Sequence, residues 1–212
     1  MSIHFTPEDI RYIEAHFIEF GVLCRSYGRD FASVLGWVEG GSLPQPSYTL
    51  PDGRRMVSRN YFDLPDPAGN AETLRRFFID RHAAAARELC LAVAEEHPRE
   101  SFEAYMQGVY GICLREPSPE NIARKEWLIR LIEDFLEHPH PQDSGWCTRL
   151  RLHVDALDRL EMPFCDYDRR FFGRPLSRDR LISAVRIQYP KAFQERDAAF
   201  AQAGRDRLAV QP

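Results

Sequence analysis

The stretch that decides the fold is residues 36–62, GWVEGGSLPQPSYTLPDGRRMVSRNYF. A helix is expected to end at Gly40–Gly41, because glycine readily adopts the left-handed conformation that closes helices. The strand-like segments 47–50 and 55–62 flank Asp52–Gly53, and Asp-Gly is a favoured pair in tight hairpin turns. The stretch therefore predicts a helix end followed by a two-stranded hairpin.

Three helical patterns precede this hairpin. Thr6 and Pro7 begin the first, since a hydroxyl N-cap followed by proline and acids is typical of a helix start. A second is expected over 18–27, and a third from the N-cap Asp30 to Gly40. The last two are joined by a short turn at Gly28, so they predict a helix-turn-helix. With the hairpin as its wing, residues 1–64 are predicted to form a winged helix-turn-helix domain.

A cluster of helix breakers over residues 63–73, DLPDPAGNAET, marks the expected domain boundary. Apolar residues then recur at helical spacing, for example at Leu74 and Phe78, and helix starts are indicated at Ser118 and Ser177. We therefore predict a mainly α protein, with a helical bundle over 70–196 and a frayed tail over 197–212.

Composition restricts the function class. The chain has 28 basic and 32 acidic residues, no apolar run long enough to span a membrane, and no signal-peptide pattern at its start. A cytoplasmic protein is the expectation. The five scattered cysteines form no CxxC pair, which argues against a zinc ribbon or a disulfide framework and favours buried thiols.

The predicted recognition helix, DFASVLGWVEGG (30–41), carries no Arg, Lys, Asn or Gln, the side chains that read base edges and phosphates. Residues 1–62 hold six arginines against seven acids, and this balance disfavours DNA as a partner. This domain is instead expected to contact another protein, a peptide or substrate, or the helical part of the same chain, and the wing residues expected to make that contact are Tyr48, Arg54, Arg55 and Tyr61.

The stretch 36–62 resembles the winged helix of MerR-type and excisionase-type proteins, without their basic recognition positions. Three blocks, LPQPSYTLPDGRRMV (43–57), GVYGICLREPSPENIARKEWLI (108–129) and DYDRRFFGRPLSRDRLI (166–182), resemble an uncharacterised family of small bacterial proteins placed among natural-product biosynthesis proteins. The resemblance implies a context of specialised metabolism and carries no catalytic motif with it.

The familiar nucleotide, hydrolase and zinc-protease motifs are absent, so no cofactor is expected. No metal site is expected either. The segment EHPHPQD (137–143) is interrupted by two prolines and is interpreted as a surface loop. His82 and Glu88 share a predicted helix, but six residues is not a chelating spacing.

Two stretches have a composition suited to chemistry. In 105–127, Arg115 precedes a helix N-terminus, so it could hold a carboxylate or phosphate with help from Lys125; Tyr105 and Tyr110 complete this candidate set. The alternative is that Arg115 pairs with a nearby glutamate and fixes the loop.

The second stretch, FCDYDRRFFGRPLSRDR (164–180), alternates acids and arginines. Asp166 or Asp168 could act as an acid–base catalyst, beside an anion site whose candidate residues are Tyr167, Arg169, Arg170 and Arg178. The same composition would suit an inter-helix corner clamped by Asp–Arg bridges, or a protein interface.

The function predicted is binding of an anionic small molecule, or a carrier- or peptide-linked intermediate, in natural-product biosynthesis. The winged helix would recognise the substrate or a protein partner. Any catalysis would be metal-independent acid–base chemistry of the cyclase, lyase or isomerase type. The alternatives are a MerR-like transcriptional regulator with a helical ligand-binding domain, and an interaction module without catalysis.

Overall fold

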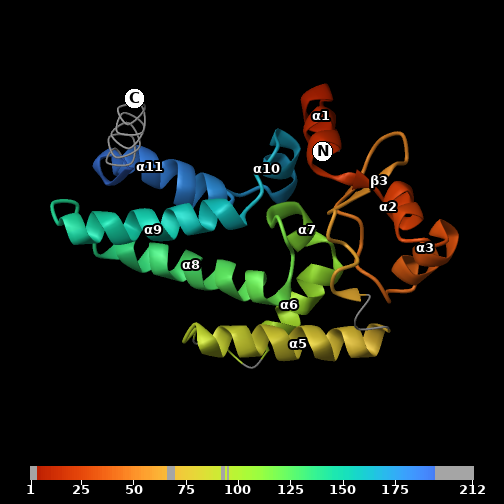
Figure 1. Ribbon diagram of the computed structural model, residues 1–212. Coiled ribbons are helices and arrows are strands. Elements are labelled where there is room, and N and C mark those ends of the chain that lie inside the picture. Colours follow the sequence, from red (N-terminus) through yellow and green to blue (C-terminus); the bar gives the residue numbers. More distant parts are fainter. Residues whose placement is uncertain (1–3, 66–69, 92–93, 95, 194–212) are drawn as a thin grey trace, which may run out of the picture. The chain divides into compact units, whose positions relative to one another are not determined.

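The structure is a computed structural model and describes residues 4–65, 70–91, 94 and 96–193. It is mainly helical, with one small antiparallel sheet of three strands (Figure 1). The elements up to the sheet are α1 (Pro7–His16), β1 (Ile18–Glu19), α2 (Phe20–Ser26), α3 (Phe31–Glu39), β2 (Tyr48–Thr49) and β3 (Arg55–Val57). Those that follow are α5 (Ala71–Glu88), α6 (His97–Met106), α7 (Val109–Cys113), α8 (Pro119–Glu137), α9 (Ser144–Leu160), α10 (Asp166–Phe172), the π-helix η1 (Arg178–Ser183) and α11 (Ala184–Gln188).

Three of the predicted helix starts are confirmed by their caps, whereas at Ser177 the π-helix η1 follows without a side-chain cap bond. At the start of α1, the Thr6 hydroxyl accepts from the backbone N–H of Asp9, whose carboxylate accepts in return from the Thr6 N–H. The Asp30 carboxylate caps α3 by accepting from the backbone N–H of Ser33 at 2.8 Å. The Ser118 hydroxyl accepts from the N–H of Asn121 at the start of α8.

The expected second helix is shorter at its N-terminal end than its pattern suggests. Ile18 and Glu19 form a strand, and Ile18 pairs with Val57 of β3. This long-range pairing overrides the local helical pattern, because it gives the backbone groups of Ile18 and Glu19 partners while Ile18 packs on the core beside it. The sheet consequently has the order β1-β3-β2, one strand more than predicted.

The predicted hairpin is confirmed. Tyr48 pairs with Met56, and Thr49 pairs with Arg55. Gly53 takes a φ of 85° in the turn, a conformation that a side chain would disfavour. We call residues 4–62 the head; its own core is made of Phe20, Leu23, Cys24, Val34, Val38, Val57, Tyr61 and Phe62.

The contacts divide the chain into two compact units. Unit 1 comprises Met1–Trp127 and Leu160–Arg174, and unit 2 comprises Leu128–Arg159 and Pro175–Pro212. Residues on both sides of the domain boundary expected at 65–69 therefore contribute to unit 1. Most of that boundary, Val93 and the expected tail over 197–212 lie outside the described residues.

Glycines allow the head to approach the α6–α7 turn inside unit 1. Gly108 has a φ of 77°, and a Cβ there would lie 2.6 Å from the Gln45 carbonyl oxygen. The N–H of Gln45 donates to the Met106 carbonyl at 2.7 Å. The Tyr61 hydroxyl also donates to the carbonyl of Pro44 in the same loop, at 2.5 Å.

In unit 2, the later part of α8 and α9 contact through aromatic rings. Phe135 lies 6.0 Å from Trp146 and 5.5 Å from His153, measured between ring centroids. The segment 138–143 is exposed, as expected for a surface loop.

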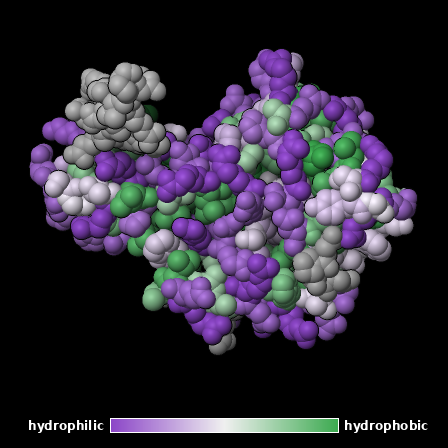
Figure 2. Space-filling model, in the orientation of Figure 1, coloured by the Kyte–Doolittle hydropathy of each residue, from purple (hydrophilic) through white to green (hydrophobic). Residues whose placement is uncertain are grey.

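Over the described residues, no helix has the length and apolarity needed to cross a membrane. Figure 2 shows a largely hydrophilic face on which hydrophobic side chains gather in small groups.

The cysteines are all free thiols. Cys24, Cys113 and Cys165 are buried as expected, whereas Cys90 is exposed and Cys147 is partly so.

Candidate functional site

The predicted acid–base residue Asp168 lies in a buried hydrogen-bond network of unit 1. Its carboxylate accepts from the Tyr48 hydroxyl at 3.0 Å and from the Cys165 N–H at 2.9 Å, and the residue is only 1% exposed. Burial raises the pKa of this carboxyl group. Its partners come from the head hairpin and from the N-terminus of α10, so Asp168 joins these two elements.

A second carboxylate, Asp9 of α1, holds the same end of α10. It accepts from the backbone N–H of Tyr167 at 2.9 Å and from the Arg170 guanidinium at 2.7 Å. Although burial acts to raise the pKa of Asp9, hydrogen bonds from the Thr6 and Tyr167 amides and from Arg170 lower it to about 2. This arrangement agrees with the alternative interpretation of 164–180 as a corner clamped by an Asp–Arg bridge.

The other charged candidates of this stretch lie apart from the network. Asp166 and Arg169 form an exposed ion pair with each other at 3.1 Å. Arg178 belongs to unit 2, where it pairs with Asp158.

The candidate wing residues differ in exposure. Tyr48 and Tyr61 are buried, at 4% and 7% exposure, and burial raises the pKa of both hydroxyls. Arg54 pairs with Asp52 and Glu14, and Arg55 pairs with Glu39 at 3.5 Å. The two tyrosines thus face the interior, and the two arginines face acids of the head.

The candidate residues of 105–127 also lie in different surroundings. Tyr105 is buried, and Arg115 is exposed, with its guanidinium 4.0 Å from the Met162 sulfur. Lys125 lies 3.0 Å from the carboxylate of Glu161, which has no exposed surface. Burial alone would lower the pKa of Lys125, but the nearby Cys113 sulfur and the Glu161 carboxylate favour its charged form, and the pKa lies above its usual value.

The backbone of the first stretch meets the segment just before the second, at an isolated antiparallel bridge between Leu114 and Glu161. The Arg115 N–H donates to the Leu160 carbonyl, and the Met162 N–H donates to that of Cys113. Two cavities beside the first stretch take lining residues from it, including Tyr105 and Glu116, but none from 164–180 among the described residues.

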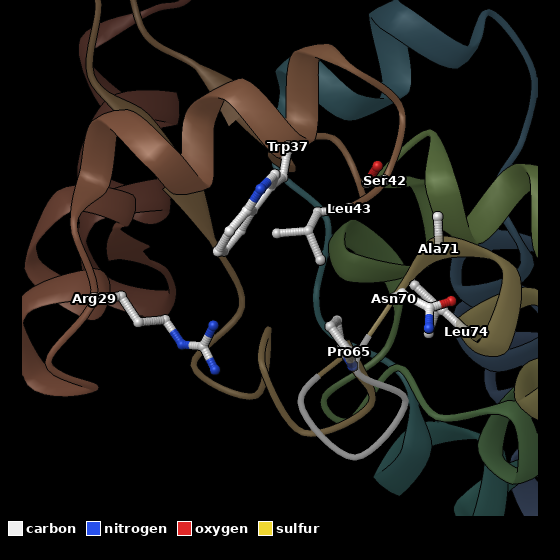
Figure 3. A pocket seen from close by; sticks show the side chains of 8 residues that line it. All are labelled: Arg29, Trp37, Ser42, Leu43, Pro65, Asn70, Ala71 and Leu74. Atoms are coloured by element: carbon white, nitrogen blue, oxygen red, sulfur yellow. The ribbon is translucent and has the colours of Figure 1, made fainter.

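A larger cavity, of about 350 Å³, lies elsewhere in unit 1. Its lining comes from the head, from Pro65 in the segment after the head, and from the start of α5 with its N-cap: Arg29, Trp37, Ser42, Leu43, Pro65, Asn70, Ala71 and Leu74. Figure 3 shows Trp37 and Leu43 on one side, Arg29 reaching toward the same space, and the α5 residues opposite. None of these residues was predicted from the sequence to belong to a site.

Local sequence explains how the head positions this lining. Val34 and Val38 bury one face of α3 in the head core, which leaves Trp37 on another face with 49% of its surface exposed. The guanidinium of Arg29 lies over the Phe62 ring, 4.7 Å from its centroid, so a buried aromatic side chain orients the cation. Asn70 is the N-cap of α5 and accepts from the Thr73 N–H at 2.9 Å.

A cluster of metal-ligating residues lies in another part of unit 1. His82 of α5, His97 of α6 and Glu126 of α8 each offer one ligand atom, and these atoms lie within 4.8 Å of one another. Nε2 of His97 is 2.8 Å from Oε2 of Glu126, and Nε2 of His82 is 3.3 Å from the same oxygen. Burial acts to raise the pKa of Glu126, but the two imidazoles lower it below its usual value.

A buried hydrophobic cluster lies beside these ligands. Ala85 and Ala86 of α5 and Ala123 of α8 belong to it, so α5 and α8 pack together near His82 and Glu126. Sequence reasoning missed the cluster because its members stand 15 and 29 positions apart on three helices (82, 97 and 126). The available signal was the place of His82, four residues after Phe78 on the apolar face of α5.

Comparison with known protein families finds a match for part of the chain. The sequence profile of a family of unknown function, DUF6058, matches residues 71–190, from the first residue of α5 almost to the end of the described chain. No curated protein and no solved structure is found to match the chain. The matched region contains the His82–His97–Glu126 cluster, and the head precedes it.

Proposed function

Since the chain belongs to the family DUF6058, whose function is unknown, we propose a function from its own side chains: it binds an anionic small molecule with a flat, apolar part in the cavity between the head and α5. The observation that carries this proposal is the presence of Arg29 and an exposed Trp37 on one cavity of about 350 Å³. The natural-product context is taken from the resemblance of the three sequence blocks, so the ligand class proposed is a carboxylate intermediate of specialised metabolism, free or carrier-linked.

Charge supports an anion. Arg29 contributes a guanidinium that can bind a carboxylate through two parallel hydrogen bonds. The cavity also borders Asn70 and Ala71, the N-cap and the first residue of the 18-residue helix α5. The N-terminus of a helix carries partial positive charge, which favours an anion at this side of the cavity.

Shape supports a flat apolar group beside that anion. Trp37, Leu43 and Leu74 line the same space, and the indole of Trp37 offers a face on which a planar ring can stack. The volume of about 350 Å³ lies at the lower end of the range typical of small-molecule sites. A compact aryl or branched carboxylate therefore fits better than a nucleotide or a long acyl chain.

The winged helix-turn-helix interpretation of the head belongs to this proposal, with a changed role. The third helix of such a domain would normally read the major groove, but α3 carries no basic residue and contributes Trp37 to the cavity instead. The wing arginines that could contact phosphates, Arg54 and Arg55, pair with acids of the head. These features favour ligand recognition over the alternative of a MerR-like DNA-binding regulator.

Acid–base catalysis by Asp166 or Asp168 is left out of the proposed function. Asp168 is buried among its own hydrogen-bond partners, and Asp166 is paired on the surface. The proposal therefore concerns binding, and it places the ligand at a different arginine from those expected in 164–180.

The test is calorimetric titration of the purified chain with a panel of aryl carboxylates, each paired with its neutral carboxamide. We expect the carboxylates to bind more tightly, and Arg29→Gln to weaken their binding about tenfold or more while leaving the amides unchanged. Arg25→Gln removes an exposed arginine outside the cavity and is the matched control. Trp37→Ala should weaken both members of each pair.

Two outcomes would overturn the proposal. One is equal affinity of wild type and Arg29→Gln for every carboxylate; the other is no binding by any member of the panel at millimolar concentration. A DNA-binding assay tests the alternative function, a DNA-binding regulator. Tight binding to duplex DNA, weakened by Arg54→Gln and Arg55→Gln and by added salt, would support the regulator instead.

A further inference from the structure

We propose that His82, His97 and Glu126 form a zinc site of the two-histidine, one-carboxylate type, with a fourth position open to solvent. The site lies within unit 1, in the region that the family profile matches. It is independent of the cavity proposed above to bind an anion, which none of these residues lines.

The donor set is suited to zinc. Two imidazole nitrogens and one carboxylate oxygen are a recurrent set of three protein ligands, with water or substrate as the fourth. Tetrahedral ligation with metal–ligand distances of about 2.0–2.1 Å places neighbouring ligand atoms roughly 3.3 Å apart. The distances from Glu126 Oε2 to the His82 and His97 nitrogens, 3.3 and 2.8 Å, are close to this spacing, and all three ligand atoms lie within 4.8 Å of one another.

The imidazole of His82 is the observation that separates a metal site from a hydrogen-bonded cluster. It has no exposed surface, and neither ring nitrogen has a hydrogen-bond partner among the described residues. Nε2 lies 3.3 Å from Glu126 Oε2 but lacks the alignment of a hydrogen bond. Burial of a polar group in this way is unfavourable, and coordination of a metal ion by Nε2 would relieve that cost.

The surroundings orient the other two ligands. Oε1 of Glu126 accepts from the Ser101 hydroxyl at 3.0 Å and from the Tyr110 hydroxyl at 3.5 Å, so Oε2 is left to face the two imidazoles. Nδ1 of His97 lies 3.8 Å from the carboxylate of Glu100, while its Nε2 points to Glu126. Partners of this kind behind the ligands are typical of metal sites, where they fix the ring orientation.

Exposure leaves a path to the fourth position. His82 is fully buried, but the side chain of His97 is 28% exposed and that of Glu126 is 15% exposed. An ion held by the three ligands would therefore have a side directed to water. An open position of this kind is typical of zinc sites that bind an exchangeable water or a substrate atom.

The test uses the full chain, stripped with a chelator and then titrated with zinc, with cobalt as a spectroscopic substitute. We expect about one ion per chain, a visible cobalt absorption of four-coordinate intensity, and a rise in the thermal unfolding midpoint on adding zinc. His97→Ala and Glu126→Gln should each lower zinc affinity at least about a hundredfold and abolish the cobalt band.

His138→Ala removes an exposed histidine of unit 2 and should bind zinc like wild type. Circular dichroism shows whether each variant folds, and the partly exposed position of His97 makes His97→Ala the variant best able to do so. The proposal is overturned if the wild-type chain takes up no zinc at micromolar concentration. It is equally overturned if folded His97→Ala and Glu126→Gln both retain wild-type affinity and spectrum.

Discussion

The hydroxyl of Tyr48 donates to the carboxylate of Asp168 at 3.0 Å, across 120 positions of the sequence. This bond joins the head hairpin to α10 in the interior of unit 1. Both residues were expected to meet a ligand or partner, Tyr48 on an exposed wing and Asp168 as a catalyst. Because they bond to each other, their role in this structure is to stabilise the contact between the hairpin and α10.

Removing this hydroxyl should destabilise the protein. Tyr48→Phe leaves a buried carboxylate without one of its donors, and hydrogen bonds to charged groups contribute roughly 1.5–3 kcal/mol. We expect the free energy of unfolding, measured in urea, to fall by about 2 kcal/mol. Tyr27→Phe, at an exposed tyrosine of the head, should change it by less than about 0.5 kcal/mol. Combining Tyr48→Phe with Asp168→Asn should give less than the sum of the two effects; strict additivity would show that the bond contributes nothing.

The hydrogen bonds that Asp9 accepts from the Thr6 and Tyr167 amides and from Arg170 should make stability depend on pH in the acid range. The pKa of Asp9 is lowered from 3.8 to about 2 in the folded chain, so the folded state binds the proton less tightly than the unfolded state. The resulting stabilisation, about 2 kcal/mol, is present above pH ~4 and is lost as the pH falls through ~2.

Asp9→Asn removes this dependence. The difference in unfolding free energy between wild type and Asp9→Asn should therefore be largest near neutral pH and shrink by about 2 kcal/mol toward pH ~2. Asp166→Asn, at an exposed acid of the same region, serves as control and should change stability by a few tenths of a kcal/mol. A constant difference between wild type and Asp9→Asn at all pH values would contradict the prediction.

Local signals in the sequence were sufficient for the helix starts and the hairpin turn, because caps and turn residues act within a few positions. Thr6, Asp30 and Ser118 cap the helices that their patterns predicted, and Gly53 takes the expected turn conformation. Strand β1 was missed because only its partner β3, about 40 positions later, keeps Ile18 and Glu19 extended.

Site residues were harder to predict because their roles depend on long-range neighbours. The alternation of Tyr48, Thr49 and Leu50 indicates that one face of β2 is buried, but it does not say that Asp168 lies there. The cluster of His82, His97 and Glu126 has no spacing that a linear motif could show.

Lys125 is predicted to be essential for stability. Its ammonium is the counter-charge of Glu161, a carboxylate with no exposed surface, so Lys125→Met would leave a buried charge without that partner. Breaking one side of a buried ion pair costs about 3–5 kcal/mol. Lys191, the other lysine of the chain, is exposed, so Lys191→Met should have little effect on the free energy of unfolding. Adding Glu161→Gln to Lys125→Met should restore part of the loss, and a Lys125→Met protein as stable as wild type would refute the prediction.

Gly108 is predicted to be irreplaceable where the head meets the α6–α7 turn. Alanine there would meet two penalties: a φ of 77°, and a Cβ 2.6 Å from the Gln45 carbonyl oxygen and 3.0 Å from that of Pro46. Gly173 is a control for the backbone strain alone, because its φ is 62° but no atom lies within 4 Å of the position of a Cβ. We expect Gly173→Ala to cost about 1 kcal/mol of unfolding free energy, and Gly108→Ala at least about 2 kcal/mol more, because the obstructing atoms are backbone. Equal losses for the two variants, measured by urea unfolding, would show that the loop at residues 44–47 moves aside without cost.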